Sequence, residues 1–393
     1  MVAVRAREPR TLSVSVLETP FRVVFGGGVS DEDAARIADS WASCAAEPDD
    51  EARDVLAEVA ATPSASLDDS PRVSSATLEQ LEESLTSTLT VEAIGARRSD
   101  LLMLHACGIA DDSGRVLAFV AASGTGKTTI ARTLGLRFGY VTDETVAVTP
   151  DGRVLPYPKP LSVKPLTGSA PKAQLAPGSL SLRPVPEVPL RLAGVVLLER
   201  RDGVGTPFLE DVDPMEAIED LVPQTSYLSA RPRPIADLVR TLTGLGGVRR
   251  LVYSEAGSVV PLVEEAFDTL GAHAPAIWNE VLALPLEPLQ EARSGSVLRA
   301  PADDVIALPD GQLLVFCEDT LVRLSGIGPI VWRHLGSGMD VDGLVAAVLD
   351  EAGPPPPGVD ATAVVEAALV ELEGLRVITR GAPPGPTPDG WHV

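Results

Sequence analysis

The sequence is poor in the side chains that build disulfide frameworks and metal centres. Its 393 residues include three cysteines, Cys44, Cys107 and Cys317, and four histidines, all scattered along the chain. An odd number of widely spaced cysteines argues against a disulfide framework and against a zinc site. The scattered histidines argue against a histidine-based metal cluster. We therefore expect a cytoplasmic protein.

Long apolar stretches are also absent. No stretch approaches the length of a transmembrane helix, and the opening residues, Met1 to Pro9, lack the apolar centre of a signal peptide. The chain is nonetheless 45% hydrophobic, which predicts a globular protein with cores for two or three domains.

Basic residues, and lysine above all, are in short supply. The 32 lysines and arginines include only four lysines and stand against 55 acidic residues, which gives a formal net charge of −23. Nucleic acids and anionic membranes attract basic surfaces, so this balance disfavours both as partners. Little lysine beside much alanine, valine, leucine, arginine, glycine and proline is typical of a GC-rich bacterial genome.

The chain does contain a glycine-rich segment, Ala121 to Thr129, between an apolar run at 116–120 and a helical pattern at 130–134. A strand, a glycine loop and a helix in this order predict a phosphate-binding loop, or P-loop. Its glycines let backbone N–H groups turn toward phosphates, its lysine reaches the outer phosphates, and the next hydroxyl binds Mg²⁺. The alternative interpretation is a glycine-containing turn that carries a lysine by chance and binds no phosphate. The expected nucleotide contacts are Ser123, Gly124, Thr125, Gly126, Lys127, Thr128 and Thr129, with Thr128 on the metal.

Three further residues flank this loop closely enough to share its site. His105 ends the apolar run 101–104, and the pair Asp143 and Glu144 follows an expected strand at 140–142. Phosphoryl transfer needs a base for the acceptor hydroxyl and a carboxylate for magnesium, so Asp143 and Glu144 are candidates for both roles. A histidine near phosphate donates a hydrogen bond or moves a proton. The alternatives are a core histidine and an acidic surface turn.

The remaining pattern predicts two folded regions separated by a proline-containing boundary near 271–296. A proline-rich stretch at 150–189 reads as an extended connection, because proline is excluded from helix interiors and inner strands. The acidic, Pro/Ser-containing stretch 47–74 reads as a loop. Strands are expected at 12–25, 192–198, 250–253, 298–307, 312–317 and 321–324, and helices at 30–46, 75–94, 214–221, 234–242, 259–269, 328–335, 341–349 and 361–372.

The first region resembles the HPr kinase/phosphorylase family, most closely its HprK-related branch near bacterial peptide-modification genes. The resemblance covers about 101–267 and rests on 105–107, 111–114, 122–129, 142–144 and, more weakly, the Pro-rich segment Pro158 to Lys164. It implies the mixed-sheet P-loop fold shared with phosphoenolpyruvate carboxykinases. Ala121 stands where the family usually has Gly, and Glu144 where it usually has Asp. Alanine is tolerated if that position needs no positive φ.

The last region resembles the PqqD-like peptide-binding module known as the RiPP recognition element. The resemblance covers about 298–379 and rests on 324–335, the helix start at Asp340 and the pattern at 364–378. It implies a small winged-helix-like α+β domain that captures a leader peptide by strand addition. A DNA-binding winged helix is the competing interpretation, but residues 295–393 hold 14 acidic and 5 basic side chains. The expected contacts are Leu321, Val322, Arg323 and Leu324 on the edge strand and Val364, Ala368 and Leu372 on a helix.

Together these patterns predict an α/β chain divided into an N-terminal region of unclear role packed on the kinase domain (1–97), a P-loop domain (98–270), a linker (271–297), a peptide-recognition domain (298–380) and a disordered tail (381–393). The implied function is transfer of the γ-phosphoryl of Mg·ATP to a Ser or Thr hydroxyl of a ribosomally made precursor peptide. Lys127 would hold the phosphates, Asp143 accept the hydroxyl proton, Glu144 support the metal and His105 assist.

Two other functions stay open at this point. The chain could be a non-catalytic nucleotide-binding adaptor that presents the precursor to another enzyme of the pathway, or a kinase for a small molecule. Relatives assemble through the kinase domain, so a homo-oligomer is compatible with the resemblance.

Overall fold

The computed structural model describes residues 10–60, 70–163, 172–269, 278, 281–286 and 296–380. The chain divides into two compact units, one of residues 1–228 and 244–274 and the other of residues 229–243 and 275–393. The sequence pattern assigned 229–243 to the P-loop domain, whereas the structure places this segment in the second unit. Most of the expected linker, Lys164, and the tail at 381–393 lie outside the described residues.

The first unit begins with a four-stranded sheet in the order β1-β2-β3-β4. The single strand expected at 12–25 is wrong: the chain turns at Leu17 and Glu18, both with positive φ, and forms an antiparallel hairpin. The loop expected at 47–74 is also wrong, because it contains two strands that pair in parallel. The elements are β1 (Arg10–Val16), β2 (Thr19–Phe25), β3 (Arg53–Val59), β4 (Arg72–Ser75), α1 (Asp31–Ser40) and α2 (Leu78–Ala96).

The first helix begins after Ser30, as the sequence predicts, but ends at Ser40 rather than 46, and the second begins at Leu78 because Ser75 still belongs to β4. Ser30 accepts a hydrogen bond from the Asp33 N–H while the Asp33 carboxylate accepts one from the Ser30 N–H, a complete capping box. The core of the layer continues into the P-loop region, where it includes Met103 and Tyr157. The Tyr157 hydroxyl also lies 2.7 Å from that of Thr90 on α2. The N-terminal residues therefore share a core with the strands that carry the candidate site.

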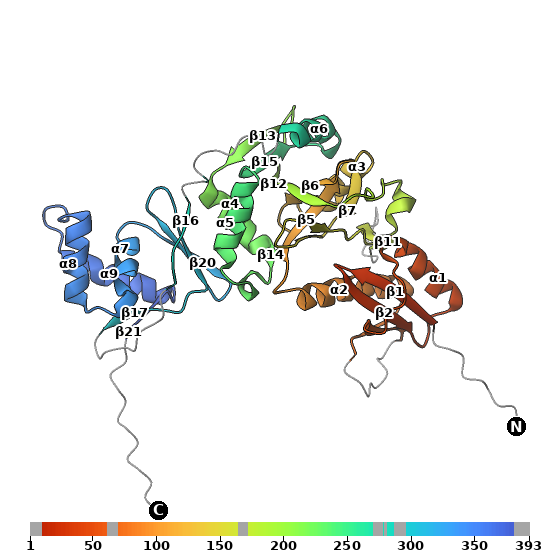
Figure 1. Ribbon diagram of the computed structural model, residues 1–393, viewed down its shortest axis with the longest axis horizontal. Helices are drawn as coiled ribbons and strands as arrows, with labels where there is room; N and C mark the ends of the chain where they lie inside the picture. Colours follow the sequence, from red (N-terminus) through yellow and green to blue (C-terminus); the bar gives the residue numbers. More distant parts are fainter. Residues whose placement is uncertain are drawn as a thin grey trace, which may run out of the picture. The chain divides into compact units, whose positions relative to one another are not determined.

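The glycine-rich loop follows strand β6 of a mixed nine-stranded sheet with the path β13-β15-β12-β6-β5-β8-β9, while β7 and β14 pair with β5. Strand β12 pairs in parallel with β6 and β15, and the β5 pairings are antiparallel. Helix α3 packs against β5 and β7 (Figure 1). The strands are β5 (Leu102–Ala110), β6 (Arg115–Val120), β7 (Gly139–Thr142), β8 (Thr145–Val148), β9 (Val154–Leu155), β12 (Arg191–Arg200), β13 (Phe208–Val212), β14 (Thr225–Ser226) and β15 (Val248–Tyr253), and the helices are α3 (Lys127–Gly135), α4 (Pro214–Leu221) and α6 (Val260–Thr269).

The proline-rich connection between β8 and β12 contains no α-helix among its described residues. Its regular structure is limited to β9, the two-stranded pair β10 (Leu161–Val163) and β11 (Ala173–Leu175), and a 3₁₀ turn at Pro177–Leu180. This agrees with the extended connection expected from ten prolines.

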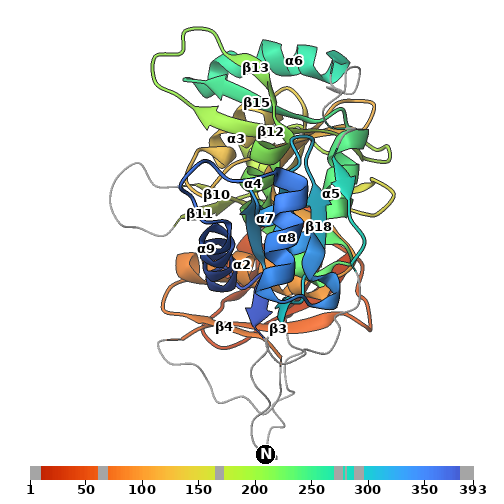
Figure 2. The ribbon, with the colours of Figure 1, turned by 90° about the vertical axis from the view of Figure 1, so that its left-hand side faces the viewer.

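The second unit combines a sheet of order β16-β18-β19-β20 with the pair β17-β21 and four helices among its described residues. The strand expected at 298–307 is wrong, because it is broken into β17 and β18, which belong to different sheets. Helices α7, α8 and α9 contact one another, and Figure 2 shows them as a group. The elements are α5 (Pro234–Gly244), β16 (Leu282–Ala283), β17 (Val297–Arg299), β18 (Asp304–Ala307), β19 (Leu313–Cys317), β20 (Thr320–Leu324), α7 (Gly328–His334), α8 (Val341–Ala352), α9 (Ala361–Gly374) and β21 (Ile378–Arg380).

The segment 229–243 is fixed to this unit by the fully buried Asp304 at the start of β18. Its carboxylate accepts hydrogen bonds from Arg233 Nε at 2.6 Å and from the Ala236 N–H at 2.7 Å. Ala236 lies in the first turn of α5, where N–H groups lack intrahelical partners and attract negative charge. Asp304 therefore caps a helix that lies some 70 residues earlier in the chain.

Candidate active site

The glycine-rich segment forms an exposed loop between β6 and α3. Gly124 and Gly126 adopt φ values of +86° and +101°, a conformation that side chains disfavour, so both glycines are required by the backbone. Ala121 is buried directly after β6 and lies outside the positive-φ region, which explains why alanine fits there. Ser123, Gly124 and Thr125 are exposed, and α3 begins two residues later at Lys127. In phosphate-binding proteins, an exposed glycine loop at the start of a helix forms an open cradle for the phosphate groups.

Lys127, the first residue of α3, folds back over this cradle. Its Nζ donates hydrogen bonds to the carbonyl oxygens of Ala121 at 2.5 Å and Ala122 at 3.1 Å. Burial lowers the pKa of the Lys127 ammonium, while the negative charges of Asp143 and Glu144 act in the opposite direction. The ammonium is thus held at the loop by weak neutral acceptors that a phosphate would replace.

The acidic pair lies between β7 and β8, next to the loop. Asp143 is buried, and its Oδ2 accepts a hydrogen bond from the Thr128 hydroxyl at 3.1 Å. Its Oδ1 accepts one from the Tyr140 hydroxyl at 3.0 Å. The Glu144 side chain is 39% exposed, so it reaches solvent where Asp143 does not. The structure therefore brings Thr128, Asp143 and Glu144 together, as the sequence predicted.

A second lysine enters this site from the connection after β9. Lys159 Nζ lies 2.9 Å from Asp143 Oδ1 and 3.1 Å from Glu144 Oε2, with only 2% of its side chain exposed. Burial favours the neutral amine, but the two carboxylates outweigh it and raise the pKa of Lys159 above its ordinary value. The sequence offered only its place in the segment Pro158 to Lys164, and assigned it no role.

His105 lies on β5, opposite Thr145 in the register with β8. It is half-buried, and burial together with the charge of Lys127 lowers the pKa of its imidazole. Both effects favour the neutral form of the ring. The charges of Lys127, Asp143 and Glu144 all act on the pKa of the His105 ring, so the ring is close enough to interact with them electrostatically.

The residues of this site offer only a small set of protein ligands to a magnesium ion. Among the described residues there is no group of three or more His, Cys, Asp and Glu side chains arranged to bind a metal. The hydroxyl of Thr128 and the carboxylate of Asp143 are the pair that P-loop proteins offer to Mg²⁺. Mg²⁺ normally takes its other ligands from water and phosphate oxygens, so this small donor set fits it.

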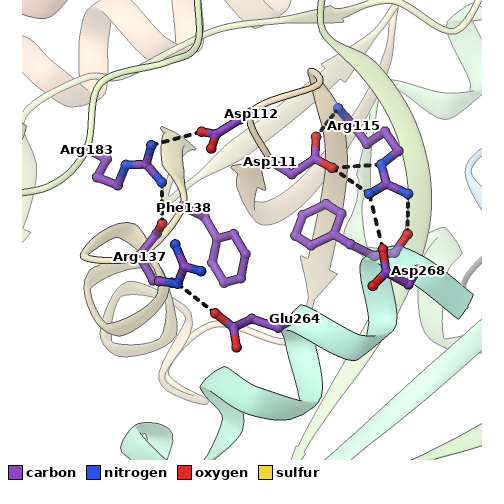
Figure 3. Close-up of a pocket in the computed structure, with 9 residues that line it drawn as sticks. Asp111, Asp112, Arg115, Arg137, Phe138, Arg183, Glu264 and Asp268 are labelled. Atoms are coloured by element: carbon purple, nitrogen blue, oxygen red, sulfur yellow. Dashed lines mark hydrogen bonds and ion pairs between the residues drawn. The ribbon is translucent and has the colours of Figure 1, made fainter.

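Two hollows of similar volume lie in the first unit. One, of about 290 Å³, lies along α3 and is lined by Thr129, Arg132, Thr133, Leu136, Leu180 and Leu182. The other, of about 270 Å³, lies where β6 begins, at the end opposite the P-loop (Figure 3). Its charged side chains pair with one another, as Arg183 does with Asp112 and Arg137 with Glu264. The charged side chains that line the second hollow are therefore already paired with one another.

The expected peptide contacts divide into accessible and buried residues within the second unit. In the described part of the chain β20 pairs only with β19, so its other edge is open. Leu321 and Arg323 are at least partly exposed, whereas Val322 and Leu324 are buried in the core. On α9, Val364 is exposed and Ala368 is half-buried, but Leu372 belongs to the core. Val370, which the sequence did not single out, exposes 64% of its surface.

No protein-family model matches this chain, and neither does any curated protein. Of the described helices, none has the length and apolarity needed to cross a membrane. The chain is an α/β protein with mixed parallel and antiparallel sheets.

Proposed function

We propose that this chain is a Mg·ATP-dependent kinase with a P-loop fold of the HPr kinase type, and that it phosphorylates a Ser or Thr hydroxyl of a ribosomally made precursor peptide. The observation that carries the proposal is the hydrogen bond of 3.1 Å between the Thr128 hydroxyl and Asp143, directly after a glycine loop with Lys127. A hydroxyl and a carboxylate in this relation to a P-loop are the usual protein ligands of the nucleotide's magnesium ion.

The geometry favours a division of labour between the two carboxylates that differs from the sequence-based expectation. Both oxygens of Asp143 already accept hydrogen bonds, and the side chain is buried, which suits a metal ligand better than a base. Glu144 is the more exposed carboxylate, and we assign to it the role of the base that accepts the proton of the acceptor hydroxyl. The oxygen of the acceptor hydroxyl then forms a bond to the γ-phosphorus. At the same time the bond between the γ-phosphorus and the bridging oxygen on the β-phosphate breaks, and ADP leaves. Magnesium supplies charge neutralisation for the phosphates.

The other parts of the site take supporting roles in this proposal. Lys127 leaves its carbonyl partners and holds the outer phosphates, and neutral His105 donates a hydrogen bond to the transferred group. The hollow beside α3 receives the nucleoside, since its volume of about 290 Å³ adjoins Thr129 at the phosphate end. Ligand pockets commonly occupy roughly 300–1,000 Å³, so this volume suits a small part of a ligand such as a nucleoside.

The second unit would bind the leader of the precursor through the open edge of β20, in the manner of a PqqD-like module. An extended peptide gains backbone hydrogen bonds from such an edge and specificity from side-chain pockets. Tethering the leader raises the effective concentration of the acceptor hydroxyl at the kinase site, which gives a reason for joining both units in one chain.

A second candidate function is a nucleotide-binding adaptor that presents the precursor to another enzyme. The contact of Lys159 with both carboxylates favours it, because carboxylates already neutralised by an ammonium suit binding without turnover. The two functions differ in one measurable product.

The deciding experiment is mass spectrometry of the precursor peptide after incubation with the full chain and Mg·ATP. Lys127→Ala removes the lysine proposed to bind phosphate, and Lys172→Ala is the matched control, since the Lys172 ammonium forms an exposed ion pair with Glu83. A phosphoryl increment with the wild type and the control, absent with Lys127→Ala, supports the kinase. Peptide that binds but stays unmodified with ATP bound supports the adaptor.

A further inference from the structure

Lys159 is held by more acceptors than any other lysine among the described residues. Its ammonium has three N–H bonds, and three oxygens lie within reach: Asp143 Oδ1 at 2.9 Å, Glu144 Oε2 at 3.1 Å and the Pro160 carbonyl at 3.2 Å. The side chain is almost completely buried. A long, flexible side chain is thereby fixed in one place, with its charge between two carboxylates.

That place has a particular meaning in phosphoryl-transfer chemistry. Neighbouring carboxylates repel one another unless a cation separates them. In sites with two metal ions, such carboxylates bridge or share divalent cations that neutralise the developing charge. Here the ammonium of Lys159 contacts one oxygen of Asp143 and one of Glu144, while the other Asp143 oxygen faces Thr128. One cation position is therefore filled by the protein itself, and the Thr128 side remains for one metal ion.

The choice of lysine is also informative in this chain. Only four lysines stand beside 28 arginines, yet two of the four, Lys127 and Lys159, converge on this site. An ammonium is a compact point charge, whereas a guanidinium is a planar fork with five donors. The three N–H donors of an ammonium radiate from one nitrogen atom. They therefore match a position between two carboxylate oxygens and one carbonyl oxygen. Pro158 and Pro160 restrict the backbone on either side of Lys159 and so limit the positions that its Nζ can reach.

We infer that Lys159 is a positioning residue that acts as a built-in cation in place of a second divalent metal, so that the nucleotide-loaded site holds a single metal ion. The prediction of one metal ion per bound nucleotide rests on the proposed nucleotide-binding function. The prediction that Lys159 keeps a divalent cation away from the two carboxylates does not rest on it. The ammonium keeps the Asp143 carboxylate turned toward Thr128 and keeps Glu144 beside it.

The test counts Mn²⁺ ions by electron paramagnetic resonance in the full-length protein, first alone and then with a non-hydrolysable ATP analogue. The wild type should bind one Mn²⁺ per bound nucleotide. Lys159→Met should gain a second ion, and without nucleotide it should bind Mn²⁺ at least tenfold more tightly than the wild type. The double variant Lys159→Met/Glu144→Gln should lose that gain, and Lys172→Met should behave as the wild type.

Two Mn²⁺ ions per nucleotide in the wild type would overturn the inference, and this count stands even if Lys159→Met does not fold. Unchanged Mn²⁺ affinity and stoichiometry in folded Lys159→Met, verified by circular dichroism, would overturn it as well. A wild type that binds no nucleotide would instead refute the proposed function. In that case the comparison without nucleotide still decides whether Lys159 keeps a cation away from the carboxylates.

Discussion

Replacing Arg323 by proline should weaken leader-peptide binding without unfolding the second unit. The two-residue turn at Glu318 and Asp319 has positive φ at both positions, which defines a tight hairpin between β19 and β20. The residues flanking such a turn, Cys317 and Thr320, form a hydrogen-bonded pair. Because hydrogen-bonded and non-hydrogen-bonded pairs alternate, the N–H of Arg323 points away from β19, toward the open edge.

The magnitude follows from the loss of a single backbone donor. A hydrogen bond contributes about 0.5–1.5 kcal/mol net, so a peptide that pairs with this edge should lose roughly 2- to 12-fold in affinity. The ladder to β19 stays complete, because only the outward N–H is removed. The same substitution at Val322, whose N–H points to Val315, should instead destabilise the unit.

The assay is fluorescence anisotropy of a labelled leader peptide with the full chain, next to thermal unfolding of each variant. Arg323→Ala is the matched control, because it removes the side chain and its exposed bond to Gln312 but keeps the N–H. Equal binding by Arg323→Pro and the wild type would refute strand addition at β20. Equal weakening by Arg323→Ala and Arg323→Pro would show that the side chain, and not the backbone edge, carries recognition.

Three further results are expected. Gly126→Ala forces a side chain into φ +101° at a cost of about 1–2 kcal/mol, so Mg·ATP should bind roughly 5- to 30-fold more weakly by calorimetry, whereas Ala121→Gly should bind as the wild type. Asp304→Ala removes a charged hydrogen bond to Arg233 and a helix cap, and should lower the free energy of urea unfolding by about 2–3 kcal/mol; no change would contradict the capping role. Burial raises the pKa of the Cys44 thiol to about 12, so the unfolded chain releases this proton first and stability should fall by up to about 1.4 kcal/mol per pH unit above pH ~8.5, with a smaller slope in Cys44→Ala urea titrations.

Local patterns were sufficient to predict the part of the site that is contiguous in sequence. The loop from Ala121 to Thr129 contains its own glycines, hydroxyl and lysine, and positive φ at Gly124 and Gly126 is a local backbone requirement. The acidic pair was visible because it ends a strand adjacent in sequence to α3. The cap at Ser30 was likewise legible, since a capping box needs only four consecutive residues.

Contacts that join distant segments could not be read in this way. Lys159 lies in a proline-rich stretch without periodicity, and only the folded chain shows that it meets Asp143 and Glu144. The strands at 53–59 and 72–75 were missed because their charged and small residues obscure the alternation of buried and exposed positions. The hairpin at Leu17 was missed because neither turn residue is Gly, Asn or Asp, the usual signals for positive φ.

The origin of α5 has a consequence for any attempt to divide the molecule. The second unit includes residues 229–243, which lie in the sequence between two segments of the first unit. These residues supply the hydrogen-bond donors and the positive charge that neutralise the Asp304 carboxylate. A fragment that begins near residue 298 would leave this carboxylate buried or exposed without its helix, and a fragment that stops near 270 would contain α5 with nothing to cap it. Simple truncation therefore yields neither half intact. An isolated second unit would have to carry α5 on a new linker, and a gene fusion that joined two independent domains end to end would not by itself have produced this arrangement.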